Sequence, residues 1–401
     1  MLKSLQIPSP VSSKSFRPAA LMILLGCALP ILTAPPAQAQ TYSILYNFTG
    51  LADGGDPYAG VTLDRGGNLY GATATGGGDG DPGTVYKLTN RNGSWTFARL
   101  YDFGAFGNVI IGPNGTLYGV NGSNQVFNLQ PPPHFLPNLL APWMETTLYS
   151  SSAGSYAPVV FDRAGNIYGT TYDGGSQGGG SVFELSPSNG GWTYTVIHSF
   201  GTDFDGSFPI AGVVIDAAGN LYGTTLSGGA YGNGTVFELS PSDGGWTETL
   251  LHSFTGGNDG GDPYGGLIFD ALGNLYGATP GLFNAGYPGG SVFKLTPSGN
   301  NWTFSVLYTF PESGDECGPR GTPAMDAAGA LYDTTTCAPD NVFKLTPVNG
   351  GWTYTSLHEF DERGDGYYPE AGVTLDANGN IYGATTGGGA YNNGIVFQIT
   401  P

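Results

Sequence analysis

The stretch GVVIDAAGNLYG, residues 212–223, is one copy of a pattern that recurs along the chain and decides its fold. Its core, Asn-(Leu/Ile)-Tyr-Gly, is found in five copies, and two altered copies read Thr-Leu-Tyr-Gly and Ala-Leu-Tyr-Asp. The tyrosines of these copies are Tyr70, Tyr118, Tyr168, Tyr222, Tyr276, Tyr332 and Tyr382. Because they lie 48 to 56 residues apart, they indicate a tandem array of one supersecondary unit.

Each copy contains four short segments with strand character. In the quoted copy these are residues 211–216, 221–225, 235–239 and 246–254. All are rich in β-branched and aromatic residues and are bounded by Gly, Pro, Asn or Asp. Beyond the N-terminal segment the chain shows no sustained apolar period of 3.6 residues, so the pattern predicts an all-β fold.

Four strands in about 50 residues is typical of a propeller blade. On the fourth strand we expect Trp246, Leu250, His252 and Phe254 on one face and Leu251 on the other. Packing residues on both faces suit a blade between two neighbours, because a two-layer sandwich would leave one face polar. All six tryptophans occupy the same repeat position, which predicts one large aromatic anchor per blade.

The last copy stops at residues 396–401, after three strands. Residues 42–48, at the other end of the chain, match residues 194–200 in pattern and can supply the missing fourth strand. Closing the ring in this way removes two exposed sheet edges. We therefore predict a monomeric seven-bladed β-propeller with four antiparallel strands per blade, closed by the N-terminal strand.

The N-terminus has the features of an export signal. Basic residues precede an apolar run at residues 19–32, and the small-x-small pattern Ala37-Gln38-Ala39 follows. We expect a signal peptide at 1–39 and one propeller domain at 40–401. The sequence Leu24-Leu25-Gly26-Cys27 resembles a lipobox, which makes a lipoprotein acylated at Cys27 the alternative. No later segment is long and apolar enough to span a membrane.

Charge limits the partners. The chain has 12 Lys and Arg residues against 31 Asp and Glu residues, a net charge of −19. Nucleic acids and anionic membrane surfaces bind to clustered basic side chains, so neither partner is expected. The acidity suits the solubility of an exported protein, with a cation-binding surface as the alternative.

The repeat resembles a known family. In order, the motifs Gly-Val-x-x-Asp-x-x-Gly-Asn-Leu-Tyr-Gly, Gly-Gly, Gly-Thr-Val-Phe-x-Leu, and Trp with a strand ending in Phe resemble the GloVer tandem repeat of secreted bacterial proteins. The resemblance covers residues 42–401, and the first two strands are more weakly similar to NHL-type propeller repeats. It implies a propeller and export but no particular chemistry. We expect no counterpart of the C-terminal anchors found in the family, and copy two carries an insert at residues 130–142.

Five aspartates align in the loops that enter the first strands, each four residues before a proline. They are Asp53, Asp205, Asp259, Asp315 and Asp365. Equivalent loops emerge on one face of a propeller, so these carboxylates are candidate Ca²⁺ ligands. The alternative is a turn in which each aspartate caps its own loop. A second series, in the turns before the Asn-Leu-Tyr-Gly motifs, is read as structural.

Tyrosines align in the Gly-rich loops between second and third strands, at Tyr231, Tyr287 and Tyr391. Exposed aromatic side chains there are candidates for contacting a glycan or a partner protein, with loop packing as the alternative. Cys317 and Cys337 flank one predicted hairpin and are expected to form a disulfide in an oxidising compartment, with two unpaired thiols as the alternative.

Histidine marks no obvious active site. His198, His252 and His358 occupy a position held by tyrosine in other copies, so we interpret it as a packing position with one polar end. No acidic partner is expected to recur beside them, and no nucleotide loop or nucleophile elbow is present. We therefore expect no catalytic residues, and no cofactor unless Ca²⁺ binds.

The sequence thus favours a secreted or envelope-associated binding scaffold that is not an enzyme and meets a glycan or protein at one propeller face. The alternative is a propeller enzyme, such as a lyase or hydrolase, with its site at the mouth of the central channel. Propellers host both, so the fold does not choose between them.

Overall fold

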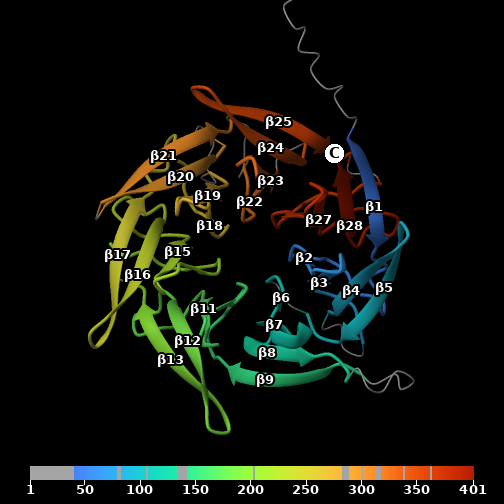
Figure 1. Cartoon of the computed structure of the whole chain (residues 1–401), viewed down its shortest axis with the longest axis horizontal. Coiled ribbons are helices and arrows are strands. Elements are labelled where there is room, and N and C mark those ends of the chain that lie inside the picture. The colour runs from blue at the N-terminus through green and yellow to red at the C-terminus, as the bar shows by residue number, and fades with distance from the viewer. Residues whose placement is uncertain are drawn as a thin grey trace, which may run out of the picture. The chain divides into compact units, whose positions relative to one another are not determined.

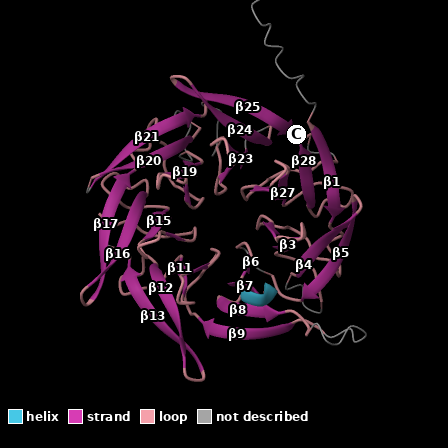
Figure 2. Ribbon diagram, in the orientation of Figure 1, coloured by secondary structure: helices cyan, strands magenta, loops and turns pink. Residues whose placement is uncertain are grey.

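Seven four-stranded antiparallel sheets surround a central axis in the computed structural model (Figures 1 and 2), which confirms the predicted propeller. The structure describes residues 40–78, 83–104, 107–133, 142–201, 204–281, 289–299, 301–311, 318–336, 339–361 and 364–401. The signal peptide predicted at 1–39, with the lipobox cysteine Cys27, lies outside the described residues.

Each blade runs from a two-residue inner strand to a long outer strand (Figure 1). Blade 1 contains β2 (Thr62–Leu63), β3 (Leu69–Ala72), β4 (Val85–Arg91) and β5 (Ser94–Tyr101). Blade 2 contains β6 (Ile110–Ile111), β7 (Leu117–Val120), β8 (Gln125–Gln130) and β9 (Met144–Ser150). Blade 3 contains β10 (Val160–Phe161), β11 (Ile167–Thr171), β12 (Ser181–Ser188) and β13 (Gly191–Ser199). Blade 4 contains β14 (Val214–Ile215), β15 (Leu221–Thr225), β16 (Thr235–Ser242) and β17 (Gly245–Ser253).

The remaining blades follow the same plan. Blade 5 contains β18 (Ile268–Phe269), β19 (Leu275–Thr279), β20 (Ser291–Ser298) and β21 (Asn301–Thr309). Blade 6 contains β22 (Ala324–Met325), β23 (Leu331–Thr335), β24 (Asn341–Val348) and β25 (Gly351–Glu359). Blade 7 contains β26 (Thr374–Leu375), β27 (Ile381–Thr385), β28 (Ile395–Thr400) and β1 (Thr41–Asn47).

The hydrophobic core lies between blades. One cluster joins Val182 and Phe200 of blade 3 to Leu221, Phe237 and Leu239 of blade 4, and all five side chains are buried. Equivalent clusters fill the other interfaces. Each sheet therefore buries both of its faces against its neighbours, which is why the strands are apolar on both sides.

The outer strands differ from the sequence expectation at one point. In blade 4, Val236 pairs with His252 but Phe237 pairs with Leu250, so Leu251 is an extra residue in a β-bulge. The bulge reverses the alternation of side chains: Leu251 packs into the cluster shared with blade 5, and Leu250 is 41% exposed. His252 and Phe254 therefore pack toward blade 5 together with Leu251, whereas Trp246 packs toward blade 3. The expectation that Trp246, His252 and Phe254 lie on one face and Leu251 on the other is wrong. The bulge residues of the seven blades are Leu45, Leu100, Leu148, Ile197, Leu251, Leu307 and Leu357.

The turn before each Asn-Leu-Tyr-Gly motif is held by its aspartate, as predicted. In blade 4, Asp216 Oδ1 accepts hydrogen bonds from the backbone N–H groups of Ala218 and Asn220 at 2.8 and 2.9 Å. Its Oδ2 accepts from the side-chain amide of Asn220 and from the hydroxyl of Tyr222 at 2.9 and 3.2 Å. One carboxylate thus fixes both the turn and the motif tyrosine, whose ring is buried.

The glycine of this motif is required by close packing. A Cβ atom at Gly223 would lie 2.6 Å from Cζ of Phe237 on the neighbouring strand. The tryptophans are half-buried and contact the motif tyrosine of the preceding blade. The ring centroids of Trp246 and Tyr168 are 6.0 Å apart. The predicted anchor thus packs across a blade interface.

The ring is closed by the N-terminal strand. β1 pairs antiparallel with β28, with Ile44 opposite Phe397 and a bulge at Leu45, as in the other outer strands. The N–H of Phe48 donates to the carbonyl oxygen of Gly394 at 3.1 Å, and the Phe48 side chain is 0% exposed. This confirms the predicted closure (Figure 1).

The one helical element in the described part of the chain is a 3₁₀ turn, Pro113–Gly115, which replaces the aspartate turn in blade 2. Nothing helical in that part could therefore cross a bilayer.

Deleting the closing strand is expected to open the ring. A chain that begins at Thr49 lacks β1 and Phe48, so β28 becomes an exposed edge available to other molecules. We expect a lower melting temperature and oligomers, measured by circular dichroism and gel filtration against a chain that begins at Gln40. Two chains with equal melting temperatures and elution volumes would contradict closure.

A pair of point variants tests the same interface without a truncation. Phe48→Ala is expected to lower the free energy of unfolding by about 3–5 kcal/mol, because it leaves a cavity in a packed core. Leu51→Ala, at a side chain that is 73% exposed, is expected to change it by less than about 0.5 kcal/mol. Denaturant titration of both variants measures the difference.

Candidate functional site

Two sets of loops share one face of the propeller, named here the loop face. One set joins the fourth strand of a blade to the first strand of the next, and the other joins the second and third strands within a blade. Backbone bridges link the two sets, for example Gly55 with Thr75, Ser207 with Ser227 and Tyr367 with Gly387. The aligned aspartates belong to the first set and the aligned tyrosines to the second.

The described aspartates of the predicted Ca²⁺ series close their own loops. Asp259 Oδ2 accepts a hydrogen bond from the N–H of Thr255 at 2.9 Å, and Asp365 Oδ1 accepts from the N–H of Asp361 at 2.8 Å. Asp53 and Asp205 accept in the same way from the residues four positions earlier. These contacts give each carboxylate a structural role, and Ca²⁺ binding by the series stays a prediction. Asp315 lies outside the described residues.

The same carboxylates contact the Tyr/His position of the outer strand. Asp259 lies 3.0 Å from His252 Nε2, and Asp365 lies 2.8 Å from His358 Nε2. In blade 7 the hydroxyl of Tyr46 donates to Asp53 at 2.8 Å. The expectation that no acidic partner recurs beside the strand histidines is therefore wrong. The sequence did contain the signal, because each aspartate follows its Tyr or His by seven residues.

The His252–Asp259 pair shows what this contact does. Burial lowers the pKa of His252, although Asp259 opposes the shift. Burial alone would raise the pKa of Asp259, but hydrogen bonds from Thr255 and His252 lower it. At neutral pH the pair is thus a neutral imidazole that donates to an ionised carboxylate, which is an arrangement that orders a loop.

The Tyr/His position also joins adjacent blades by stacking. His252 lies parallel to Phe304 of the next blade, with ring centroids 3.6 Å apart and an interplanar angle of 4°. Phe304 stands two residues after the tryptophan of its blade, a position named here the stacking position. The other stacked pairs are His358–Tyr42, Tyr46–Phe97, Tyr149–Tyr194 and Tyr308–Tyr354.

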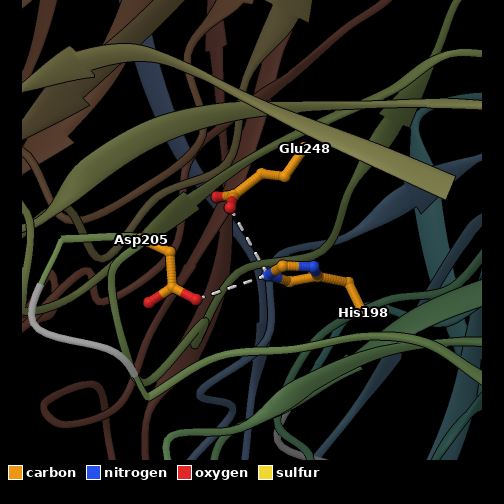
Figure 3. Close-up of side chains that lie close together, drawn as sticks. All are labelled: His198, Asp205 and Glu248. Carbon is orange, nitrogen blue, oxygen red and sulfur yellow. Dashed lines mark ion pairs between the residues drawn. The ribbon is translucent and has the colours of Figure 1, made fainter.

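Glutamate replaces the aromatic ring at the interface between blades 3 and 4. Glu248 on β17 holds the stacking position and faces His198 on β13 (Figure 3). The Nε2 atom of His198 lies 3.7 Å from a Glu248 oxygen and 3.8 Å from an Asp205 oxygen. Both distances are too long for hydrogen bonds. His198 Nε2 and Glu248 Oε1 are buried and have no hydrogen-bond partner.

The electrostatics of this cluster are unfavourable for two charged carboxylates. Burial, followed by the charge of Asp205, raises the pKa of Glu248 to about 7. Burial lowers the pKa of His198, while Asp205 acts in the opposite direction. His198, Asp205 and Glu248 are the one group of three or more His, Cys, Asp or Glu side chains in the described residues whose ligand atoms lie close enough to hold a metal ion.

A second candidate site is the central channel. A cavity of about 410 Å³ is lined by the residues that lead into the inner strands of all seven blades. Its mouth is lined by one residue from each blade, which directly follows the aligned proline or, in blades 2 and 3, the residue that takes the place of that proline. These residues are Tyr58, Asn108, Tyr156, Ile210, Tyr264, Arg320 and Glu370. The Arg320 guanidinium is 3.2 Å from the Glu370 carboxylate and lies over the ring of Tyr264, 4.9 Å from its centroid. No histidine lines this cavity in the described residues.

In the part of the chain that the structure describes, exposed aromatic side chains lie only on the loop face. Among the described residues, those that are exposed are Tyr58, Tyr156, Phe204, Tyr231, Tyr368 and Tyr391. Tyr231 and Tyr391, two of the predicted ligand-binding tyrosines, are 62% and 58% exposed. Their role stays a prediction. The third, Tyr287, and both cysteines of the predicted disulfide, Cys317 and Cys337, lie outside the described residues.

The model of the Gloeobacter/Verrucomicrobia repeat matches residues 126–341. The chain belongs to this repeat family. This confirms the family indicated by the motifs. No curated protein matches the chain in sequence.

Solved structures resemble this member of the repeat family in fold. The extracellular domain of a B. thetaiotaomicron protein described as a hybrid two-component system matches with a TM-score of 0.52 and 15% identity, over 90% of this chain and 41% of that one. PorZ, a surface component of the type-IX secretion system of Porphyromonas gingivalis, matches with a TM-score of 0.52 and 15% identity, over 86% and 46%.

A third structure, the polysaccharide lyase Uly1, matches with a TM-score of 0.48 and 11% identity, over 92% and 94%. This chain spans less than half the length of the first two proteins, the B. thetaiotaomicron protein and PorZ. At such identities the similarity shows the propeller fold alone.

The repeat-family protein departs from its own motif in blade 6, where Asp333 replaces the glycine of Leu-Tyr-Gly. The side chain is 1% exposed, and Oδ2 has no hydrogen-bond partner, whereas Oδ1 accepts from the N–H of Thr334 at 2.8 Å. A Cβ atom at Gly321, which lines the channel, would collide with Oδ1. Burial raises the pKa of Asp333 to about 7.

Asp333 is expected to make stability of the repeat-family protein fall as pH rises. Its folded-state pKa lies above the ordinary carboxyl value, so its contribution is complete below about pH 4 and is lost as pH rises through about 7. Asp333→Gly restores the repeat residue and should raise the melting temperature by a few degrees more at pH 8 than at pH 4. Thermal melts across this range measure it, and parallel curves for both proteins would contradict the expectation.

Proposed function

We propose that this protein is an exported binding scaffold that takes a hydroxyl-rich, uncharged glycan on its loop face. The observation that carries the proposal is that all exposed aromatic side chains of the described residues lie on that face. Aromatic rings offer flat apolar surfaces with polar edges, which suit the faces of sugar rings.

The arrangement of the rings supports an extended ligand. Tyr58 and Tyr156 line the mouth of the channel and are 45% and 41% exposed. Tyr231 and Tyr391 stand on loops of blades 4 and 7, farther along the chain and on different sheets. Rings on separate blades can contact several residues of one chain of sugars, and weak contacts at each ring then add up.

Charge supports an uncharged ligand. The loops of this face are rich in Asp and Glu, and their basic residues in the sequence are Arg320 and Arg363. Arg320 is already paired with Glu370. A polyanionic glycan would meet net repulsion there, whereas a neutral glycan would not.

The alternative, an enzyme at the channel mouth, has less support. Its described lining contains Glu370 with Arg320 but no histidine, and the His198 cluster lies between outer strands instead. An ion pair next to tyrosines can orient a ligand without reacting with it. Export, as a secreted or envelope protein, rests on the N-terminal sequence and is part of the same proposal, as is a monomeric state.

Alanine variants of two tyrosine sets test glycan binding. The mouth pair, Tyr58→Ala with Tyr156→Ala, and the loop set, Tyr231→Ala with Tyr287→Ala and Tyr391→Ala, should each lower affinity for a retained polysaccharide by about tenfold or more. Each ring is expected to contribute about 0.5–1.5 kcal/mol. Affinity electrophoresis in a panel of neutral and acidic polysaccharides measures retention of the chain that begins at Gln40.

Matched controls lie on the opposite face. Leu272→Ala and Val348→Ala remove side chains that are 84% and 50% exposed in the turns of that face, and retention should not change. Unchanged retention of both tyrosine variants would end the glycan proposal. Loss of retention with turnover of the polysaccharide would favour the enzyme.

A further inference from the structure

The interface between blades 3 and 4 has lost a stabilising contact that five other interfaces keep. At those five, two aromatic rings stack across the blades. Here the ring position holds Glu248, an ionisable group that is largely buried. Burying an ionised carboxylate costs free energy of folding unless a cation or hydrogen-bond donor compensates its charge. The replacement of an aromatic ring by Glu248 is therefore best explained by a ligand that supplies this compensation.

The histidine-aspartate pair is also distorted at this interface. The equivalent pairs, His252–Asp259 and His358–Asp365, are hydrogen-bonded at 3.0 and 2.8 Å. His198 and Asp205 are separated by 3.8 Å, with the Glu248 oxygen 3.7 Å from the same nitrogen. Figure 3 shows both carboxylates directed at His198 Nε2. The three groups thus converge at distances longer than hydrogen bonds.

These separations fit ligands around a small cation. Ligand atoms about 2.0–2.2 Å from a tetrahedral zinc ion lie roughly 3.3–3.6 Å from one another. The ligand atoms of His198, Asp205 and Glu248 all lie within 4.8 Å of one another, so a small movement of side chains brings them into contact with one ion. The buried atoms without hydrogen-bond partners, His198 Nε2 and Glu248 Oε1, belong to this same group.

We infer that His198, Asp205 and Glu248 bind a divalent transition-metal ion, with Zn²⁺ the best fit, which links blade 3 to blade 4. The ion supplies the positive charge that two neighbouring carboxylates need and a bond for the imidazole nitrogen. Imidazole nitrogen with carboxylate oxygen suits zinc, whereas Ca²⁺ takes oxygen ligands. The link would replace the missing aromatic stack. This inference is independent of the proposed glycan site.

Metal titration of the chain that begins at Gln40, after dialysis against a chelator, tests the site. Zn²⁺ is expected to bind one equivalent by calorimetry and to raise the melting temperature by several degrees. Co²⁺ in its place should give the visible absorption of a low-symmetry site with nitrogen and oxygen ligands. Absence of both heat and stabilisation would overturn the inference.

Glu248→Phe is the decisive variant, because phenylalanine occupies this position in blade 5 and stacks on His252. The variant should fold, melt higher than the metal-free parent and lose both the Zn²⁺ heat and the Zn²⁺ shift. Glu145→Phe changes the corresponding glutamate of blade 2 and should keep the full Zn²⁺ response. Equal Zn²⁺ binding by Glu248→Phe and the parent would assign the ion to other residues and overturn the inference.

A parallel titration with Ca²⁺ separates this site from the loop aspartates. We expect Ca²⁺ to produce less than a tenth of the Zn²⁺ stabilisation. Stabilisation by Ca²⁺ that is equal in the parent and in Glu248→Phe, with no effect of Zn²⁺, would favour the aspartate series Asp53, Asp205, Asp259 and Asp365 and contradict a transition-metal site.

Discussion

The structure depends on burial of each sheet against its two neighbours. A four-stranded blade has no second layer of its own, so Phe237 and Leu239 reach the core only because Val182 and Phe200 cover them from the preceding blade. The tryptophan points to the preceding blade, and the bulge residue points to the following one. Leu251 therefore marks the point at which one outer strand serves both interfaces. Such stacking leaves no blade stable by itself, and the ring must close to satisfy the first and last.

The same interfaces explain where chemistry can arise. Stacked rings such as His252 and Phe304 fill an interface and leave nothing for a ligand. Exchange of one ring for Glu248 turns an equivalent interface into a pocket of nitrogen and oxygen atoms without changing the backbone register. On the loop face a binding site can arise in a different way. Aspartates already hold the loops in place, and the exposed aromatic side chains of these loops are not part of the hydrophobic core, so they can be exchanged without loss of packing. Binding groups in this fold can therefore change one blade at a time.

Much of this architecture could be predicted because the copies of the repeat can be aligned with one another, so a strand that is clear in one copy locates the same strand in the others. The recurring Leu-Tyr-Gly motif and the tryptophan position located every strand, and residues 42–48 matched an outer strand in pattern. His252 was assigned to the wrong face because a bulge breaks the alternation of side chains, and a single strand gives no sign of it. The pairing of His252 with Asp259 was visible as a seven-residue offset but was overlooked, since the two series were considered separately. The approach of Glu248 to His198 could not be predicted, because it depends on how the outer strands β13 and β17 of two blades lie against each other, and no turn connects these strands directly.

The pairing of β1 with β28 has a consequence for the order of assembly. Residues 41–47 are made before the six blades that follow them, and their partners, residues 395–400, are made after those blades. β1 therefore stays unpaired until β28 has been made. An unfinished chain cannot form the ring, and its waiting strand and open edge are the kind of surface that proteases and chaperones recognise. Pairing β1 with β28 thus makes closure of the ring depend on the synthesis of all seven blades.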